Sequence, residues 1–244
     1  MIKRLFALLV LLAALNGCGG GKEPTESLYT LRPGSRWVYR VTGTVALPAS
    51  MGGGTQNLQT TSTLTVQAGT AVVKDPAGND TRALDRKFDL LLLDGRGIAA
   101  TQRLYVSQNA TGIFVHGMNV AASDTIDPAN DVWVPRTANP PSRFLYLPDP
   151  APDGRTLSYT NPLGLTTPGD HSYTLTLGSG RQAVEVPAGH YLAKGVSQVE
   201  RFDGFAITNG GFVPDVGLVS GLLDTTLASG ARVQGSIVLT SVSR

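Results

Sequence analysis

The residues able to do chemistry are few in this sequence, and their spacing does not match the common catalytic or metal-binding motifs. The three histidines are His116, His171 and His190. None of them has the helical partner four residues away, or the carboxylate neighbour, that a zinc site uses. Residues 217–221 place a serine between glycines, but the spacing differs from G-x-S-x-G and the stretch is strand-like. We therefore expect no enzyme, no catalytic residue, no metal and no cofactor.

One group of acidic residues could also carry out chemistry. Asp124, Asp127 and Asp131 precede Trp133 within a short stretch. Paired carboxylates carry out glycoside hydrolysis, and carboxylate oxygens also bind calcium. However, Asp-Pro and Asn-Asp steps are typical of ordinary turns, and the EF-hand pattern is missing. We favour a structural role and keep polysaccharide hydrolysis as a remote alternative.

Cys18 is the only cysteine of the chain, and a secretion leader precedes it. After the cationic pair Lys3-Arg4, the apolar stretch 5–15 would rise only about 16 Å as a helix, against roughly 30 Å of hydrocarbon core. Leu15-Asn16-Gly17-Cys18 resembles the lipobox of bacterial lipoproteins. The resemblance implies a signal helix, residues 1–17, that is cleaved, and a Cys18 that carries diacylglycerol and a further acyl chain such as palmitate. The alternative is an ordinary signal peptide with an incidental cysteine, but an unused thiol is a hazard in an oxidising compartment.

The residues after the cleavage position suggest where the protein works. Residues 18–27 are small and polar, which predicts a flexible tether that reaches only about 30 Å when fully extended. Resemblance to lipoprotein sorting implies that Gly19 favours the outer membrane, or otherwise the outer face of the plasma membrane. The chain has 20 basic and 18 acidic residues, and loss of Lys3 and Arg4 with the leader balances them. A balanced charge gives no electrostatic case for binding nucleic acid.

Residues 28–244 have the pattern of an antiparallel β domain. Trp37, Tyr39 and Val41 alternate with polar residues, and similar alternation recurs up to the C-terminus. Turn residues Asp94-Gly95 and Gly178-Ser179-Gly180 predict two hairpins, and short hairpins imply antiparallel pairing. Only residues 83–92 offer a helical period, which a buried strand explains equally well. We expect a mostly β fold, with a curved sheet arranged as a half-barrel or a sandwich.

Residues 124–168 differ in composition, because they hold nine of the fifteen prolines. Proline lacks a donor for the ladder, so we expect this segment to interrupt the sheet. It is either a linker between two β subdomains or a long excursion packed over one sheet. Apolar residues such as Trp133, Phe144 and Tyr146 favour the packed excursion, since a free linker would not carry them.

Three further stretches carry a resemblance. They are Leu31-Arg32-Pro33-Gly34-Ser35-Arg36-Trp37-Val38-Tyr39, Val184-Glu185-Val186-Pro187-Ala188-Gly189-His190-Tyr191 and Phe212-Val213-Pro214-Asp215-Val216-Gly217-Leu218-Val219. In this order they resemble a diffuse group of uncharacterised secreted and lipid-anchored β-rich bacterial proteins. The resemblance implies curved antiparallel sheets and no particular activity. We interpret the motifs structurally: Trp37 and Tyr39 as core anchors, Pro187 as a turn residue and Gly217 as a bulge or a close backbone approach.

Together these observations favour a lipid-anchored protein of the cell envelope that binds or carries a ligand without catalysis. A curved sheet can leave an apolar interior, so an apolar ligand is the leading expectation. The alternative is a structural or assembly subunit that binds an envelope protein through apolar residues of segment 124–168.

Overall fold

The structure is a computed structural model that describes residue 28 and residues 31–67, 73–91, 97–135, 143–166, 169–202 and 204–243. The expected signal segment 1–17 and the tether 18–27, with Cys18, lie outside the described residues. The fold is mostly antiparallel β, which confirms the class predicted from the alternation pattern. Within the described part of the chain there is no α-helix, and no helix long and apolar enough to cross a membrane.

Fourteen strands belong to one sheet, and every ladder in it is antiparallel. The elements are β1 (Arg36–Ala46), η1 (Ala49–Met51), β2 (Thr55–Val66), β3 (Val73–Lys74), β4 (Asp80–Leu91), β5 (Gly97–Asn109), β6 (Gly112–Ala121), η2 (Pro128–Asn130), β7 (Val132–Trp133), β8 (Phe144–Pro148), β9 (Thr156–Tyr159), β10 (Tyr173–Val186), β11 (Gly189–Glu200), β12 (Phe205–Val213), β13 (Gly217–Thr226) and β14 (Arg232–Ser243).

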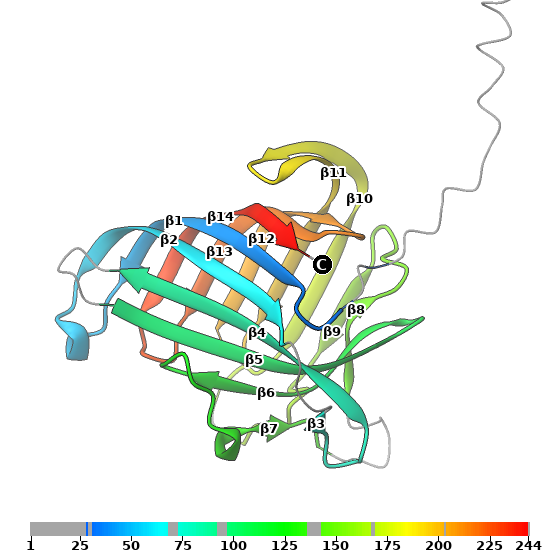
Figure 1. The fold of residues 1–244 in the computed structure, drawn as a ribbon, viewed down its shortest axis with the longest axis horizontal. Helices are drawn as coiled ribbons and strands as arrows, with labels where there is room; N and C mark the ends of the chain where they lie inside the picture. The colour runs from blue at the N-terminus through cyan, green and yellow to red at the C-terminus, as the bar shows by residue number, and fades with distance from the viewer. Residues whose placement is uncertain are drawn as a thin grey trace, which may run out of the picture.

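The chain builds this sheet from the middle outwards. β1 lies between β2 and β14, and the chain runs through β2, β4 and β5 to β6 at one end. It then crosses to the other end, enters at β9 and returns through β10 to β13 until β14 pairs with β1. The sheet curls so that β4 to β6 lie across from β10 to β13, without closing into a barrel (Figure 1). A single curled sheet corresponds to the half-barrel rather than to the sandwich.

The Pro-rich segment 124–168 makes the crossing between the two ends of the sheet. Phe144, Tyr146 and Leu147 are buried, so the packed excursion is confirmed over the free linker. The expectation that this segment interrupts the sheet is wrong, because β7 and β8 pair with β6 and β9 pairs with β10. Pro148 is the last residue of β8, where a missing ladder donor is tolerated. Residues 136–142 and 167–168 lie outside the described residues.

The two predicted hairpins have different outcomes. β4 pairs with β5 up to Leu91 opposite Gly97, which confirms the first pairing, although Asp94-Gly95 lies outside the described residues. The hairpin at Gly178-Ser179-Gly180 is wrong, because these residues lie inside β10. There the register with β11 shifts between Leu177 and Arg181, and the strand continues to a turn at Pro187-Ala188. Of the expected helical period at residues 83–92, residues 83–91 form no helix because they belong to strand β4, and residue 92 lies outside the described residues.

The glycines inside β10 mark a bend rather than a strand end. Gly180 has φ of 76°, which a residue with a side chain rarely adopts. Beyond the bend, the β10–β11 hairpin curls over the sheet (Figure 1). Its tip is held there by the Ala188 amide, which donates to the Leu239 carbonyl at 3.3 Å.

Two of the three stretches that carry the resemblance meet in the core. The Trp37 indole Nε1 donates to the Val216 carbonyl at 2.7 Å, and the Tyr39 hydroxyl donates to the Leu218 carbonyl at 3.2 Å. Both rings are buried, as a core anchor requires. Gly217 lies between these two acceptors with φ of 107°, so its glycine is required by the backbone at the start of β13.

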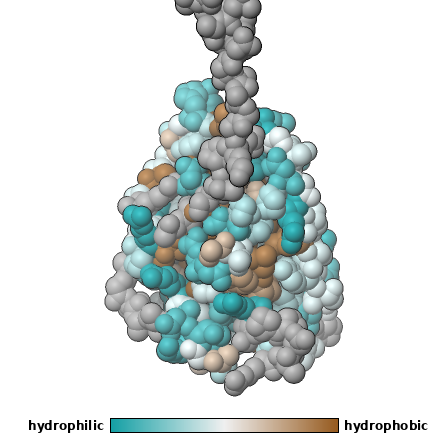
Figure 2. All heavy atoms as spheres, turned by 90° about the vertical axis from the view of Figure 1, so that its right-hand side faces the viewer, coloured by the Kyte–Doolittle hydropathy of each residue, from teal (hydrophilic) through white to brown (hydrophobic). Residues whose placement is uncertain are grey.

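The surface is mainly polar. Figure 2, which views the side where β8 and β9 lie, shows hydrophobic residues near the middle with hydrophilic ones around them. Among the described residues, the large apolar side chains that are exposed are Val120 on β6, Leu192 on β11 and Leu222 on β13. These strands are not neighbours in the sheet, and apolar residues that are exposed singly are common on soluble proteins.

Candidate functional site

The curled sheet encloses an interior cavity of about 100 Å³. Its walls are mainly apolar and come from strands on both sides of the curl, with Trp37 and Tyr39 from β1, Leu84 and Phe88 from β4, and Phe205 and Ile207 from β12. A cavity of this size is comparable to an engineered cavity of about 150 Å³ that binds benzene. The interior is therefore largely filled, with room for one ring or a short branched chain.

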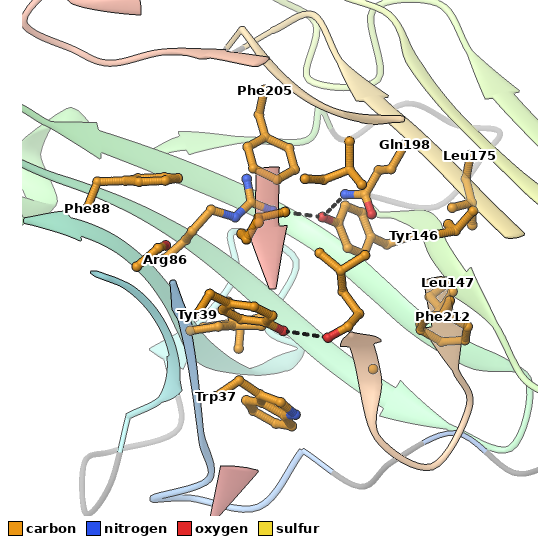
Figure 3. A pocket seen from close by; sticks show the side chains of 18 residues that line it. Trp37, Tyr39, Arg86, Phe88, Tyr146, Leu147, Leu175, Gln198, Phe205 and Phe212 are labelled. Atoms are coloured by element: carbon orange, nitrogen blue, oxygen red, sulfur yellow. Dashed lines mark hydrogen bonds between the residues drawn. The ribbon is translucent and has the colours of Figure 1, made fainter. Parts of the chain in front are cut away.

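A polar cluster interrupts this apolar wall, and Figure 3 shows three of its members, Arg86, Tyr146 and Gln198, converging. Arg86 on β4 is 3.4 Å from a carboxylate oxygen of Glu200 at the end of β11. The Arg86 guanidinium also donates to Gln102 at 2.5 Å and lies 3.5 Å from the centre of the Phe205 ring. From the opposite wall, Tyr146 and Gln198 both donate to Glu200. The five groups, which we call the Glu200 cluster, are Arg86, Gln102, Tyr146, Gln198 and Glu200.

The Glu200 cluster balances its own charge. Glu200 is fully buried and accepts hydrogen bonds from all four other members. A buried carboxylate is tolerated only when paired and hydrogen-bonded, and this one is. The neighbouring Tyr173 is also buried, and its burial, together with the hydroxyl of Tyr146 and the charge of Glu200, raises the pKa of Tyr173 well above its usual value. Tyr173 therefore stays protonated and donates to the Tyr146 carbonyl at 2.5 Å.

A second polar network lies on the other face of the same sheet. Side chains alternate along a strand, so Arg86 faces the interior while its neighbour Asp85 faces outwards and pairs with Arg103 at 2.7 Å. Ser107 on β5 shares the outward face with Arg103. Its hydroxyl lies 2.8 Å from Nε2 of His116 on β6, and Nδ1 of His116 lies 2.7 Å from Asp75. We call these three residues the Ser107 network.

The structure thus gives His116 the carboxylate neighbour that the sequence did not reveal. His190 is exposed, with Nδ1 3.9 Å from Glu185, and His171 lies in the loop before β10. Within the part of the chain that the structure describes, no group of three histidine, cysteine or acidic side chains is arranged to hold a metal.

The acidic residues before Trp133 have separate structural partners. The Asp127 side chain accepts from the Ala129 amide at the start of η2. Asp131 accepts from the Tyr105 hydroxyl at 2.8 Å and from Asn119 at 2.6 Å. Asp124 is exposed and lies 3.9 Å from Lys87. These are the turn and packing contacts that we favoured from the sequence, and Trp133 stacks on Tyr105 rather than facing an open carboxylate pair.

Comparisons with known proteins add no relative. No family model matches the chain, and no curated protein or solved structure is significantly similar to it. The interior cavity and the two polar clusters are therefore the features from which a function can be inferred.

Sequence reasoning identified Trp37 and Tyr39 but missed the polar half of the interior site. Arg86 and Glu200 stand 114 positions apart, and both lie in strands with no unusual local pattern. The lipid-attachment residue predicted from the sequence, Cys18, lies outside the described residues.

Proposed function

We propose that this protein is a lipid-anchored envelope protein that binds a small, uncharged, mainly apolar ligand inside its curled sheet. The observation that carries the proposal is the interior cavity of about 100 Å³, whose apolar walls end at the Glu200 cluster. Binding there needs no chemical step from the cluster. The volume of the cavity also limits the size of the ligand expected from the sequence, because one ring or a short chain fills the cavity.

The charge of the ligand follows from the pairing of Arg86. Its positive charge is already matched by Glu200 at 3.4 Å, so a ligand carboxylate would bring an unbalanced charge into the interior. A ligand with a hydroxyl or amide N–H could instead donate to the side-chain carbonyl of Gln198, which lines the cavity and whose amide nitrogen is engaged with Tyr146 and Glu200. An uncharged polar end therefore fits this site better than an anionic one.

The anchor is a separate part of the proposal. We assign membrane attachment to acyl chains on Cys18. Stable anchoring requires more than one such chain. Mass spectrometry of the N-terminal peptide is expected to find Cys18 as the first residue and to find it acylated. A Cys18→Ser chain that is still cut at that position and still sediments with membranes would contradict this assignment.

The alternative role as an assembly subunit draws less support from the geometry. The apolar residues of segment 124–168 on which it depended include Phe144, Tyr146 and Leu147, and these are buried in the protein's own core. They are not available to a partner in this conformation. The outer acidic residues Asp127 and Asp131 likewise have turn and packing partners, which gives polysaccharide hydrolysis no added support.

Binding can be measured through Trp37, which lines the cavity. The other tryptophan, Trp133, stacks on Tyr105 with ring centres 4.6 Å apart, outside the lining, so a Trp133→Phe variant isolates the Trp37 signal. Titration with 1-hexanol is expected to change Trp37 fluorescence saturably, with at least tenfold tighter binding than hexanoate. Equal binding of the two probes would contradict the uncharged ligand.

A substitution that fills the cavity provides the matched test. Leu64 lines the cavity, so Leu64→Phe is expected to abolish the hexanol response while the protein stays folded. Leu192→Phe adds the same aromatic ring at an exposed position of the hairpin and should leave binding unchanged. If hexanol still binds to the Leu64→Phe variant with the same affinity, the ligand site is not this cavity.

A further inference from the structure

A second cavity, which Ser107 helps to line, lies at one end of the sheet. The β4–β5 ladder ends where Arg82 pairs with Val106, and beyond this point β4 pairs with β3 instead. The two strands separate there around a cavity of about 540 Å³. Its lining includes Leu28, Leu31, Arg82 and the half-buried Ser107. This volume is within the usual range of about 300–1,000 Å³ for small-molecule sites.

Ser107 is the outer member of a hydrogen-bonded chain whose order can be assigned. Asp75 is a carboxylate and can only accept, so Nδ1 of His116 donates to it at 2.7 Å. Nε2 of His116 is then left as an acceptor, and the Ser107 hydroxyl donates to it at 2.8 Å. Nucleophile, general base and orienting carboxylate follow one another as nucleophilic catalysis by serine requires.

Hydrogen bonds to both oxygens hold the Asp75 carboxylate in place. One oxygen of Asp75 accepts from the backbone amides of Ala77 and Asn79 at 2.9 and 2.8 Å. The other accepts from the Asn79 side chain and from His116. Burial by itself would raise the pKa of Asp75, but the hydrogen bonds from Asn79 and His116 outweigh it and lower that pKa. Asp75 therefore remains ionised and fixes the tautomer of the imidazole.

The histidine is kept in its basic form. Burial lowers the pKa of His116, the contact with Asp75 partly offsets this, and the charge of Arg143 lowers it further. At neutral pH the ring is uncharged and Nε2 can take a proton. His116 owes its position to a β-bulge: Tyr105 pairs with Gly117 and Val106 with Val115, so His116 is the extra residue on β6. Bulges often redirect side chains beside active sites.

We propose that Ser107, His116 and Asp75 form a hydrolytic site for small carboxylic esters, with the acyl group bound in the adjoining cavity. Ser107 Oγ attacks the ester carbonyl and forms the acyl bond while its proton passes to His116 Nε2. The bond to the alcohol oxygen breaks, and His116 returns the proton to the departing alcohol. His116 then takes a proton from a water molecule, which attacks the acyl-serine. The bond from the acyl carbon to Ser107 Oγ breaks, His116 returns the proton to Ser107 Oγ, and the carboxylic acid is released.

Three charged side chains in the cavity wall affect which substrate can bind. Arg82 lines the cavity, and a guanidinium there can stabilise the negative charge that develops on the carbonyl oxygen. Asp80 and Asp149 line the same cavity and disfavour an anionic substrate. This activity goes beyond the proposed binding function and does not depend on it, because the two cavities share no lining residue.

The test is covalent labelling of the full protein with diisopropyl fluorophosphate. Attack by Ser107 Oγ forms an O–P bond and displaces fluoride, and peptide mapping by mass spectrometry locates the adduct. We expect labelling at Ser107 and none at Ser236, a strand serine on β14 that is more exposed. Ser107→Ala should abolish the adduct, Ser236→Ala should leave it unchanged, and His116→Gln should slow labelling at least 100-fold.

The pH dependence of the wild-type reaction tests the proposal without any variant. Because the pKa of His116 is lowered from its usual value, the labelling rate should be on its plateau at about pH 7, where the imidazole is neutral, and should fall only at acidic pH as the ring becomes protonated. An unlabelled Ser107 in the folded protein overturns the proposal. So does a rate that climbs steadily with hydroxide concentration without a plateau, because it would show a serine that His116 does not activate.

Discussion

The Glu200 cluster and the Ser107 network lie on opposite faces of β4 to β6, and both are built around a buried carboxylate. Glu200 accepts from four side chains, and Asp75 accepts from two backbone amides, one amide side chain and one imidazole. In each case the donors satisfy the carboxylate, as burial in a low-dielectric interior demands. In both regions, hydrogen-bond donors therefore compensate a buried negative charge.

They differ in where the hydrogen bonds end. The Glu200 cluster closes on itself, with Arg86 and Glu200 balancing one charge against the other. The Ser107 network is linear, and its last hydroxyl is half-buried in a cavity wall. A closed cluster contributes to stability and shapes a binding site, whereas a linear network that ends at a cavity can pass a proton to or from a bound molecule.

The largest expected effect on stability comes from breaking the closed cluster. In a Glu200→Leu variant the Arg86 guanidinium loses its buried counter-charge, which should cost about 3–5 kcal/mol of unfolding free energy. Urea denaturation monitored by circular dichroism measures the loss. The double variant Arg86→Met/Glu200→Leu should recover much of it, because no uncompensated charge remains. Asp224→Asn, which breaks the exposed pair with Arg232, is the control and should cost about 1 kcal/mol or less.

The fold was predictable where the signal is local. Alternation around Trp37 and Val41 predicts a strand with one buried face, and both side chains are buried. The hairpin predicted at Gly178-Ser179-Gly180 is wrong because glycine and serine are typical both of a turn and of a bend within a strand. Only the pairing of β10 with β11 on both sides of the bend distinguishes the two.

The sites were not predictable, because their contacts join residues that are distant in sequence. Asp75 and His116 stand 41 positions apart, and the sequence around Asp75 indicates only a turn. Ser107 and His116 are separated by nine positions, but a bulge in β6 is needed to bring them together. A search for G-x-S-x-G misses this serine, since that motif describes a turn between a strand and a helix and Ser107 lies within a strand.

The second largest effect is expected from the carboxylate of the linear network. Asp75→Ala leaves the amides of Ala77 and Asn79 and the imidazole of His116 without their acceptor, which should cost about 1–3 kcal/mol. The same urea experiment measures it. A loss as large as that of Glu200→Leu would mean that this network supports the fold as strongly as the closed cluster, and the contrast between them would fail.

A pH titration sharpens the contrast on the outer face. Burial, and then the hydrogen bond and charge of Asp131, raise the pKa of Tyr105 to about 12. The unfolded chain loses this phenolic proton near pH 10 while the folded protein keeps it. The stabilisation is therefore complete below pH 10 and is lost as the pH rises to about 12, by roughly 2–3 kcal/mol. A Tyr105→Phe variant should lack this part of the alkaline destabilisation, and a curve that matches wild type would contradict the assignment.

The smallest effect on stability is expected for Ser107→Ala, the substitution that should have the largest effect on the labelling reaction. Ser107→Ala removes one hydrogen bond of 2.8 Å from a half-buried hydroxyl and should cost about 1 kcal/mol or less. His116 keeps Asp75 as its partner, so the rest of the network stays in place. The labelling reaction, in contrast, loses its nucleophile completely. If the variant were instead strongly destabilised, the hydroxyl would serve mainly to hold β5 and β6 together, and the linear network would be a second structural cluster.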